Sequence, residues 1–167
     1  MPRSPAQTLV GRPTGQIGIV VRDLEAAARR YSALWGNGPW HCWTYGPAIL
    51  REQVYRGRPS RFSVRIALNS TAPQLELLQP LEGPSIYHEW LERHGEALHH
   101  LAVYVESLDH AIESMAGAGY DLIQCGRGMG LDGDGGFAYF DTEADLGLVL
   151  EAIERPARRR EPELVVQ

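Results

Sequence analysis

The same local pattern occurs twice in this chain, and this repeat limits the folds that the chain can adopt. Gln16 opens a short, apolar and largely β-branched run, which is followed by a helical pattern over residues 24–35. His100 opens a second such run, followed by a helical pattern over residues 108–116. Runs of this kind predict buried strands, and apolar residues three or four positions apart predict a helix with one buried face. Each copy therefore predicts a strand followed by a helix.

Each copy continues into three further predicted strands. Apolar segments between glycine, proline and polar turns place these strands at 48–55, 62–68 and 74–79 in the first copy and at 120–124, 137–141 and 148–153 in the second. Both halves thus predict the order β-α-β-β-β. We expect an α+β fold that is built from two such modules.

The composition of the remaining segments predicts the boundaries of the domain. Residues 1–13 are rich in proline, arginine and serine and predict a flexible arm. One domain is expected over 14–156, with a first module at about 14–82, a linker helix at 85–95 and a second module at about 98–154. Residues 157–167 predict a loose tail. Within the first module, residues 37–45 predict a loop whose aromatic side chains close over a site.

Charge and composition exclude several classes of function. The 167 residues carry a formal net charge of -5, and all 16 basic residues are arginine, so chemistry that needs a lysine is absent. The arginines form no basic stripe, and nucleic acid is not expected as a partner. No apolar run is long enough to span a membrane, and the two cysteines, Cys42 and Cys125, lack metal-ligand spacing. These features predict a soluble, cytoplasmic protein that does not bind membranes.

Four polar residues interrupt the apolar strands at equivalent places in the two copies. Gln16 and His100 stand at the start of the first strand of each copy, and Glu76 and Glu151 stand in the last. Two unpartnered carboxylates inside a packed sheet would be costly, and a divalent cation would remove that cost. A single histidine at a strand start is more often structural. Four coordinating side chains at repeat-equivalent places, however, favour one metal site.

The histidine pair divides into one predicted ligand and one predicted structural residue. The register of the repeat aligns His100, and not His99, with Gln16. Successive side chains of a strand point to opposite faces of the sheet. We therefore expect His99 to face away from the site.

Three segments of the chain resemble a known family. Residues 75–81 (LELLQPL), 90–95 (WLERHG) and 99–102 (HHLA) are similar to methylmalonyl-CoA epimerases. The duplicated β-α-β-β-β order resembles the vicinal oxygen chelate superfamily, which also includes glyoxalase I, extradiol dioxygenases and bleomycin-resistance proteins. The resemblance implies a cup-shaped, curved mixed sheet with helices on the outside. It also implies one divalent metal ion (Zn, Ni, Co, Mn or Fe), His100 as a ligand, and a homodimer.

Two positions depart from the epimerase pattern. Gln16 stands where the epimerases have a histidine, so the four-residue set resembles that of eukaryotic glyoxalase I instead. The epimerases also carry a second catalytic glutamate shortly before the third strand. Here that region is 58–61 (RPSR), and Glu52 lies too early in the chain to align. These departures argue against two-base epimerisation of methylmalonyl-CoA.

The leading hypothesis is a metal-dependent isomerase or lyase that removes a proton next to a carbonyl group. The metal would stabilise the enolate, and Glu151 or Glu76 would act as the base. The substrate would be a small molecule, either an acyl-CoA or an apolar carbonyl compound. Four aromatic residues are candidates for lining its pocket: Trp40, Trp43, Tyr45 and Phe137.

Two other functions use the same fold. The alternative hypothesis is a non-enzymatic protein that binds a small molecule, like the bleomycin-resistance proteins. An extradiol dioxygenase fits the residues less well, because non-haem iron usually takes two histidines and one carboxylate. Only His100 is available among the four predicted ligands.

Overall fold

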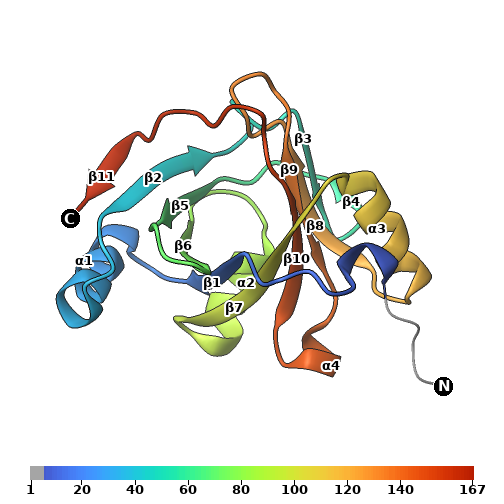
Figure 1. The fold of residues 1–167 in the computed structure, drawn as a ribbon, viewed down its shortest axis with the longest axis horizontal. Coiled ribbons are helices and arrows are strands. Elements are labelled where there is room, and N and C mark those ends of the chain that lie inside the picture. The colour runs from blue at the N-terminus through green and yellow to red at the C-terminus, as the bar shows by residue number, and fades with distance from the viewer. Residues whose placement is uncertain (1–5) are drawn as a thin grey trace.

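The computed structural model describes residues 6–167 as one large curved sheet with four α-helices (Figure 1). The strands are β1 (Gln16–Val20), β2 (Trp40–Tyr45), β3 (Glu52–Tyr55), β4 (Arg58–Pro59), β5 (Val64–Leu68), β6 (Gln74–Pro80), β7 (Ala97–Val105), β8 (Leu122–Arg127), β9 (Gly136–Phe140), β10 (Val149–Glu154) and β11 (Leu164–Val166). The helices are α1 (Leu24–Trp35), α2 (Ile86–His94), α3 (Leu108–Gly117) and α4 (Glu143–Leu146), and a 3-10 turn, η1, spans Gln7–Leu9.

The sheet has the order β11-β2-β5-β6-β1-β7-β10-β9-β8-β3-β4 and does not close into a barrel. In the first module β1 pairs in parallel with β6, and β5 and β2 follow in antiparallel pairing. In the second module β7 pairs in parallel with β10, and β9 and β8 follow in the same way. Antiparallel pairing of β1 with β7 joins the two modules. The duplicated α+β architecture that the sequence predicts is thus confirmed.

The helices begin and end at residues that suit those positions. Asp23, Ser85 and Ser107 cap the N-termini of α1, α2 and α3, and each side chain accepts a hydrogen bond from a backbone N–H in the first turn. Gly36 ends α1 in a left-handed conformation, with φ of 71°. Among residues 6–167, no helix is both long enough and apolar enough to cross a membrane.

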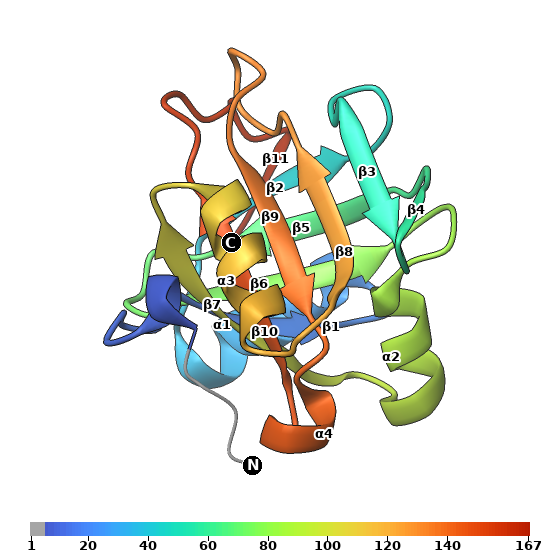
Figure 2. The same cartoon turned by 90° about the vertical axis from the view of Figure 1, so that its right-hand side faces the viewer.

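Three apolar clusters place the helices relative to the sheet. Helices α1 and α3 cover the outer face of the first and second module respectively (Figures 1 and 2). The third cluster fills the concave side, which we call the cup, and includes side chains from β2, β5, β9 and β10. Helix α2 contributes Ile86, Tyr87 and Trp90 to this inner cluster. The helix between the two modules therefore helps to fill the cup.

The second strand of the first module differs from the prediction. Residues 37–45 were expected to form a loop, but Trp40–Tyr45 form β2, which pairs with β5. Trp40 and Cys42 pack on the outer face of the sheet, while Trp43 and Tyr45 pack on the inner face. This two-residue alternation of apolar side chains stabilises a strand, although the glycine and proline before it favoured a loop. The predicted strand at 48–55 is reduced to β3, which pairs with β8 of the second module.

Both terminal segments contact the folded core. The part of the predicted arm that the structure describes includes η1, where Leu9 packs beside α3. The remainder of that arm, residues 1–5, lies outside the described residues. The segment 157–167, expected to be a loose tail, runs across the side of the cup and ends in β11, which pairs with β2 (Figure 1). Val166 is buried in the outer cluster of the first module and holds this segment in place.

Candidate metal centre

The three predicted ligands with charged or imidazole side chains lie together in the cup. Glu76 comes from β6, His100 from β7 and Glu151 from β10, and one potential ligand atom of each lies within 4.8 Å of the others. His100 Nε2 lies 3.2 Å from Glu76 Oε2 and 3.0 Å from Glu151 Oε2. We call these three residues the ligand cluster. They come from strands on both sides of the junction between the modules, as the repeat predicts.

Gly18 provides the space for the imidazole of His100. In the sheet, Gly18 of β1 is the neighbour of Glu76 on one side and of His100 on the other. A Cβ atom on residue 18 would overlap the imidazole ring of His100. A side chain at this position would therefore exclude His100 from the cup. Glycine is required here because any larger residue would occupy the space of the imidazole.

Apart from the close contacts within the ligand cluster, one buried atom of each predicted ligand has no hydrogen-bond partner among the described residues. These atoms are Gln16 Oε1, Glu76 Oε2, His100 Nε2 and Glu151 Oε2. Each is the kind of atom that coordinates a divalent cation, and each belongs to one of the four predicted ligands. Leaving such groups buried and unpartnered is unfavourable. The donor set therefore fits one metal ion.

The amide of Gln16 is oriented by a neighbouring strand. Gln16 is only 3% exposed, and its Nε2 donates a hydrogen bond of 2.8 Å to Gln74 Oε1 on β6. This bond uses the nitrogen of the amide and leaves the oxygen free. Gln16 is thereby able to serve as a fourth, neutral ligand beside the ligand cluster.

His99 does not face away from the site, and the prediction for this residue is wrong. His100 and Leu98 of β7 pair with consecutive residues of β1, so His99, which lies between them, has no partner in β1. This bulge interrupts the alternation of side chains along the strand. His99 consequently packs in the cup against the rings of Tyr87, Trp90 and Tyr139.

The position of His99 lets it orient the predicted ligand. His99 Nδ1 lies 2.9 Å from His100 Nδ1, and both side chains are fully buried. Burial lowers the pKa of His99 well below its ordinary value, and its ring is therefore neutral. When His100 is neutral, a His99 that accepts a hydrogen bond from His100 Nδ1–H leaves the Nε2 lone pair of His100 free to bind a metal ion next to the carboxylates. Partners of this kind commonly fix the tautomer of metal-binding histidines.

Charge in the ligand cluster controls the protonation of His100. Burial alone would lower the pKa of His100, but the negative charges of Glu151 and Glu76 outweigh burial and raise this pKa to about 9. Burial also raises the pKa of Glu151, and the neighbouring His100 opposes only part of this effect. Without a metal, the cluster therefore retains a proton on His100 at neutral pH.

Metal binding is expected to release this proton. Because a metal binds only neutral imidazole, metal affinity should increase about tenfold per pH unit from pH 7 towards the pKa of His100. The metal-free protein should show the opposite trend in stability. The pKa of His100 is higher in the folded state than in the unfolded state, so its contribution is present below about pH 6.5 and is lost as the pH rises through about 9. Calorimetric titration in buffers with different ionisation enthalpies counts the protons released.

The exposed His110 provides the control for this measurement. His110→Gln should release the same number of protons as the natural sequence. Metal binding without proton release at pH 7 would show that His100 is not a ligand.

The cavity around the ligand cluster is small and mostly apolar. This inner cavity has a volume of about 40 Å³. Of the four predicted pocket residues, Tyr45 and Phe137 line it, and so do Tyr87, Tyr139, Met129 and Arg159, which were not predicted. Tyr139 could have been inferred, because it lies two positions after Phe137 in the same strand and shares its face. Nothing in the local sequence marks Arg159 as part of the cup.

Two of the four predicted aromatic residues do not line this cavity. Trp43 lies on the inner face, but the guanidinium of Arg159 covers its ring at 5.1 Å. Trp40 is fully buried in the outer cluster of the first module, where its ring packs against Tyr31. Because the side chains of β2 alternate between the two faces of the sheet, Trp40 points away from the site.

No further carboxylate of the described chain lines the inner cavity beyond Glu76 and Glu151. Glu52 lies on β3 at the far end of the sheet, where its half-exposed side chain is 3.6 Å from Arg127. Residues 58–59 form β4 beside it. The described residues of this region therefore place no glutamate in the inner cavity.

Comparisons with known proteins agree with the fold. The model of one protein family, described as "Glyoxalase/Bleomycin resistance protein/Dioxygenase superfamily", matches residues 15–140. No match was found among curated protein sequences. A solved structure of a hypothetical protein from Bacillus halodurans C-125 has a TM-score of 0.63 and 21% identity, and the match covers 90% of this chain and 99% of that chain.

Two further similar structures are methylmalonyl-CoA epimerases. The enzyme from Mycobacterium tuberculosis has a TM-score of 0.59 and 22% identity, with 92% of this chain and 93% of that chain covered. A Streptomyces coelicolor variant in complex with 2-nitronate-propionyl-CoA has a TM-score of 0.58 and 21% identity, with 87% and 98% covered. At these identities the structural likeness establishes the fold alone. The family match, which spans most of the chain, shows that this protein belongs to the Glyoxalase/Bleomycin resistance protein/Dioxygenase superfamily.

Proposed function

We propose that the protein is a metal-dependent isomerase or lyase that removes a proton from the carbon next to a carbonyl group. The observation that carries this proposal is the buried ligand cluster of Glu76, His100 and Glu151, whose potential ligand atoms all lie within 4.8 Å of one another. Similar solved structures include methylmalonyl-CoA epimerases, which are isomerases. A bound divalent metal would supply a Lewis acid that polarises the carbonyl group and stabilises negative charge on its oxygen.

Glu151 is the better candidate for the base. Burial raises the pKa of Glu151, and a carboxylate with a raised pKa is a stronger base than one in water. Glu76, His100 and Gln16 would then hold the metal. The same carboxylate would return the proton, because no third carboxylate among the described residues lines the inner cavity.

Two tyrosines form a hydrogen-bonded pair beside the ligand cluster. Tyr87 donates a hydrogen bond of 3.1 Å to the hydroxyl of Tyr139, and both rings line the inner cavity. Burial raises the pKa of both hydroxyls well above the ordinary value of a tyrosine, so both remain protonated. Because Tyr87 already donates its proton to Tyr139, the Tyr139 hydroxyl is the one that can donate to a developing oxyanion, and neither hydroxyl can act as a base near neutral pH.

Replacement of Glu151 by glutamine tests this assignment. Glu151→Gln keeps the shape of the side chain but removes the base, so exchange of substrate hydrogen with deuterium from solvent should fall by about 1,000-fold or more. Exchange is followed by NMR with candidate acyl-CoA, α-keto and hydroxy-ketone compounds. The matched control is Glu113→Gln on the exposed face of α3, which should leave exchange unchanged. Full activity in Glu151→Gln would assign the base to another residue.

The alternative is a protein that binds a small molecule without converting it. It is favoured by the lack of a second catalytic carboxylate in a cavity that is otherwise lined mostly by apolar and aromatic side chains. Metal analysis separates the two functions. About one divalent ion per chain supports the enzyme, and protein purified without a stoichiometric metal supports the binding protein.

A further inference from the structure

A second and much larger pocket opens beside the ligand cluster. This outer pocket has a volume of about 910 Å³, compared with about 40 Å³ for the inner cavity. It lies where β1 and β6 begin and is bordered by the segment that follows β10. The inner cavity holds little more than an ion and a water molecule. The body of any substrate must therefore lie outside it.

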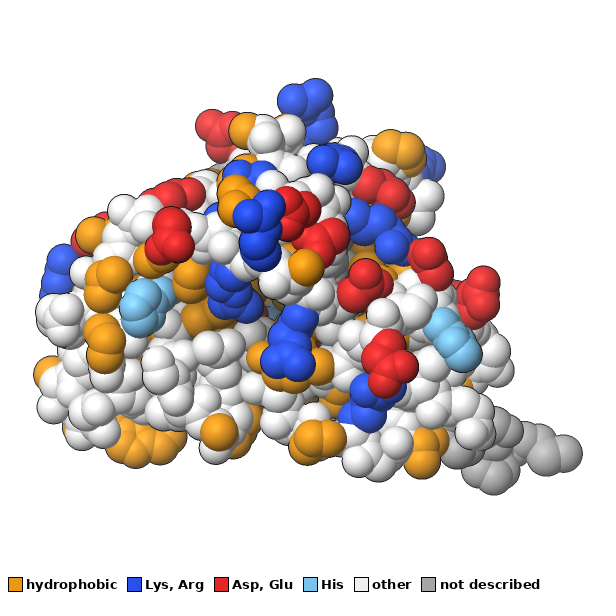
Figure 3. All heavy atoms as spheres, turned by 45° about the horizontal axis from the view of Figure 1, so that its top comes forward, with side chains coloured by type: hydrophobic (Ala, Val, Ile, Leu, Met, Phe, Trp, Pro, Cys, Tyr) orange, Lys and Arg blue, Asp and Glu red, His pale blue; other side chains and the backbone are white. Residues whose placement is uncertain are grey.

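The outer pocket concentrates positive charge in an acidic protein. Arg12, Arg155 and Arg159 line it, and none of its lining residues is an aspartate or a glutamate. No ion pair with a carboxylate of the described chain neutralises these three arginines, whereas the neighbouring Arg158 pairs with Asp132. On the face drawn in Figure 3, several arginine side chains lie near the middle, and acidic side chains lie among them. Unneutralised guanidinium groups around a cavity attract anions.

The arginines are held in position by aromatic rings. The guanidinium of Arg155 lies 4.7 Å from the centre of the Tyr104 ring, and that of Arg159 lies over Trp43. A side chain at Gly15 would overlap Tyr104, so glycine lets this ring enter the pocket. These contacts limit the freedom of long side chains and reduce the entropy lost when a ligand is bound.

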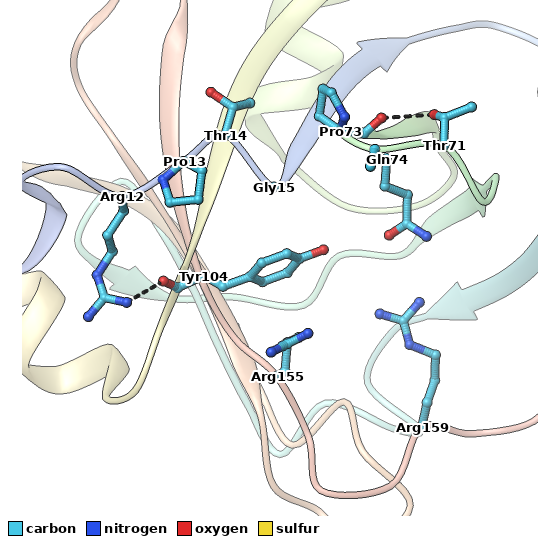
Figure 4. Close-up of a pocket in the computed structure, with 11 residues that line it drawn as sticks. Arg12, Pro13, Thr14, Gly15, Thr71, Pro73, Gln74, Tyr104, Arg155 and Arg159 are labelled. Carbon is cyan, nitrogen blue, oxygen red and sulfur yellow. Dashed lines mark hydrogen bonds between the residues drawn. The ribbon is translucent and has the colours of Figure 1, made fainter.

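The hydrogen-bond donors of the outer pocket converge from several directions. Figure 4 shows the Tyr104 hydroxyl, the Gln74 amide and the guanidinium groups of Arg155 and Arg159 around one space. Arg12 lies further out, where its Nη1 donates a hydrogen bond of 2.9 Å to the backbone oxygen of Tyr104. A planar carboxylate accepts hydrogen bonds mainly in one plane, whereas a tetrahedral phosphate accepts them from all sides. The arrangement therefore suits a phosphate.

The outer pocket is connected to the inner cavity through a shared residue and a hydrogen bond. Arg159 lines both cavities. Gln74 lines the outer pocket and accepts the hydrogen bond that orients Gln16 beside the cluster. A ligand bound in the outer pocket thus extends towards the metal centre.

We infer that the outer pocket binds a phosphate ester group, and that the substrate is a phosphorylated carbonyl compound whose phosphate lies between Arg155 and Arg159. Phosphate binding itself depends only on the pocket. The identification of the ligand as the substrate rests on the function proposed above. In this arrangement the phosphate anchors the substrate at the rim, and its carbonyl end enters the cup.

Calorimetric titration of the purified protein with phenyl phosphate tests the pocket. We expect one binding site per chain, and an affinity at least tenfold lower in the double variant Arg155→Gln/Arg159→Gln. Arg61→Gln is the matched control, because Arg61 is exposed and lies beyond the opposite end of β6, and it should bind like the natural sequence. Benzoate shares the ring of phenyl phosphate but carries a carboxylate, and it should bind at least tenfold more weakly.

Three results would overturn the inference: no binding of phenyl phosphate, equal binding by the double variant, or equal affinity for benzoate. Glu151→Gln separates the pocket from the proposed function, because it should bind phenyl phosphate normally. If no carbonyl compound exchanges hydrogen with solvent but phenyl phosphate binds through the two arginines, the proposed chemistry fails and the anion site stands. If a carbonyl compound exchanges hydrogen with solvent but phenyl phosphate does not bind, the anion site is excluded and the proposed chemistry stands.

Discussion

Replacing Gly18 with alanine is expected to abolish stoichiometric metal binding. The new methyl group would occupy the space of the His100 imidazole, and His100 would have to leave the position in which it faces Glu76 and Glu151. Loss of the single nitrogen atom among the four proposed ligands should reduce metal affinity by at least about 100-fold. Overpacking of the sheet should also lower the free energy of unfolding by about 1–3 kcal/mol. Metal content and chemical denaturation of the purified variant measure the two effects.

Gly117→Ala is the matched control for this experiment. Gly117 is the last residue of α3, and a Cβ atom there would contact nothing within 4 Å. Alanine should therefore leave metal binding unchanged and stabilise the helix slightly. If Gly18→Ala still bound one metal ion per chain, metal binding would not depend on the present position of His100. His100 would then be excluded as a ligand.

Replacing Val166 with aspartate is expected to destabilise the protein by about 3 kcal/mol or more. Val166 belongs to β11 and is buried with Trp40 and Cys42 beneath the outer face of the first module. A carboxylate in this position would be buried without a partner or would force β11 to separate from β2. Denaturant titration of the variant gives the change in the free energy of unfolding.

The neighbouring Val165 provides the comparison, because it points away from the core and is 41% exposed. Val165→Asp should change the free energy of unfolding by no more than about 0.5 kcal/mol. Equal and small effects of the two substitutions would mean that β11 is not needed for stability, and that the C-terminal segment is as loose as the sequence suggested.

The repeat made the architecture and most of the site accessible from the sequence. Because the same pattern of strands and helix occurs in both halves, the sequence predicts two equivalent modules. The polar residues that interrupt the strands at equivalent positions predict one metal site shared by both modules. The structure brings Glu76, His100 and Glu151 together as this reasoning predicts. Gln16 lies in the same cavity, with its amide oxygen unpartnered.

The errors arise where long-range contacts override local pattern. Glycine and proline before β2 suggested a loop, but pairing with β5 and β11 makes this segment a strand. Simple alternation placed His99 on the wrong face, because alternation does not reveal a bulge that depends on the partner strand. Arg159 belongs to the segment that was expected to be a loose tail, and only the path of the chain brings it beside Arg155 in the outer pocket.

The two edges of the sheet are completed by a reciprocal exchange. The first half of the chain supplies β3 and β4, which extend the edge strand of the second module. The C-terminal segment supplies β11, which extends the edge strand of the first. Each module would lose a neighbouring strand, and expose an unpaired edge, if it were separated from the other half. The duplicated units thus depend on each other for their edge strands, and the candidate metal ligands lie where the two units meet.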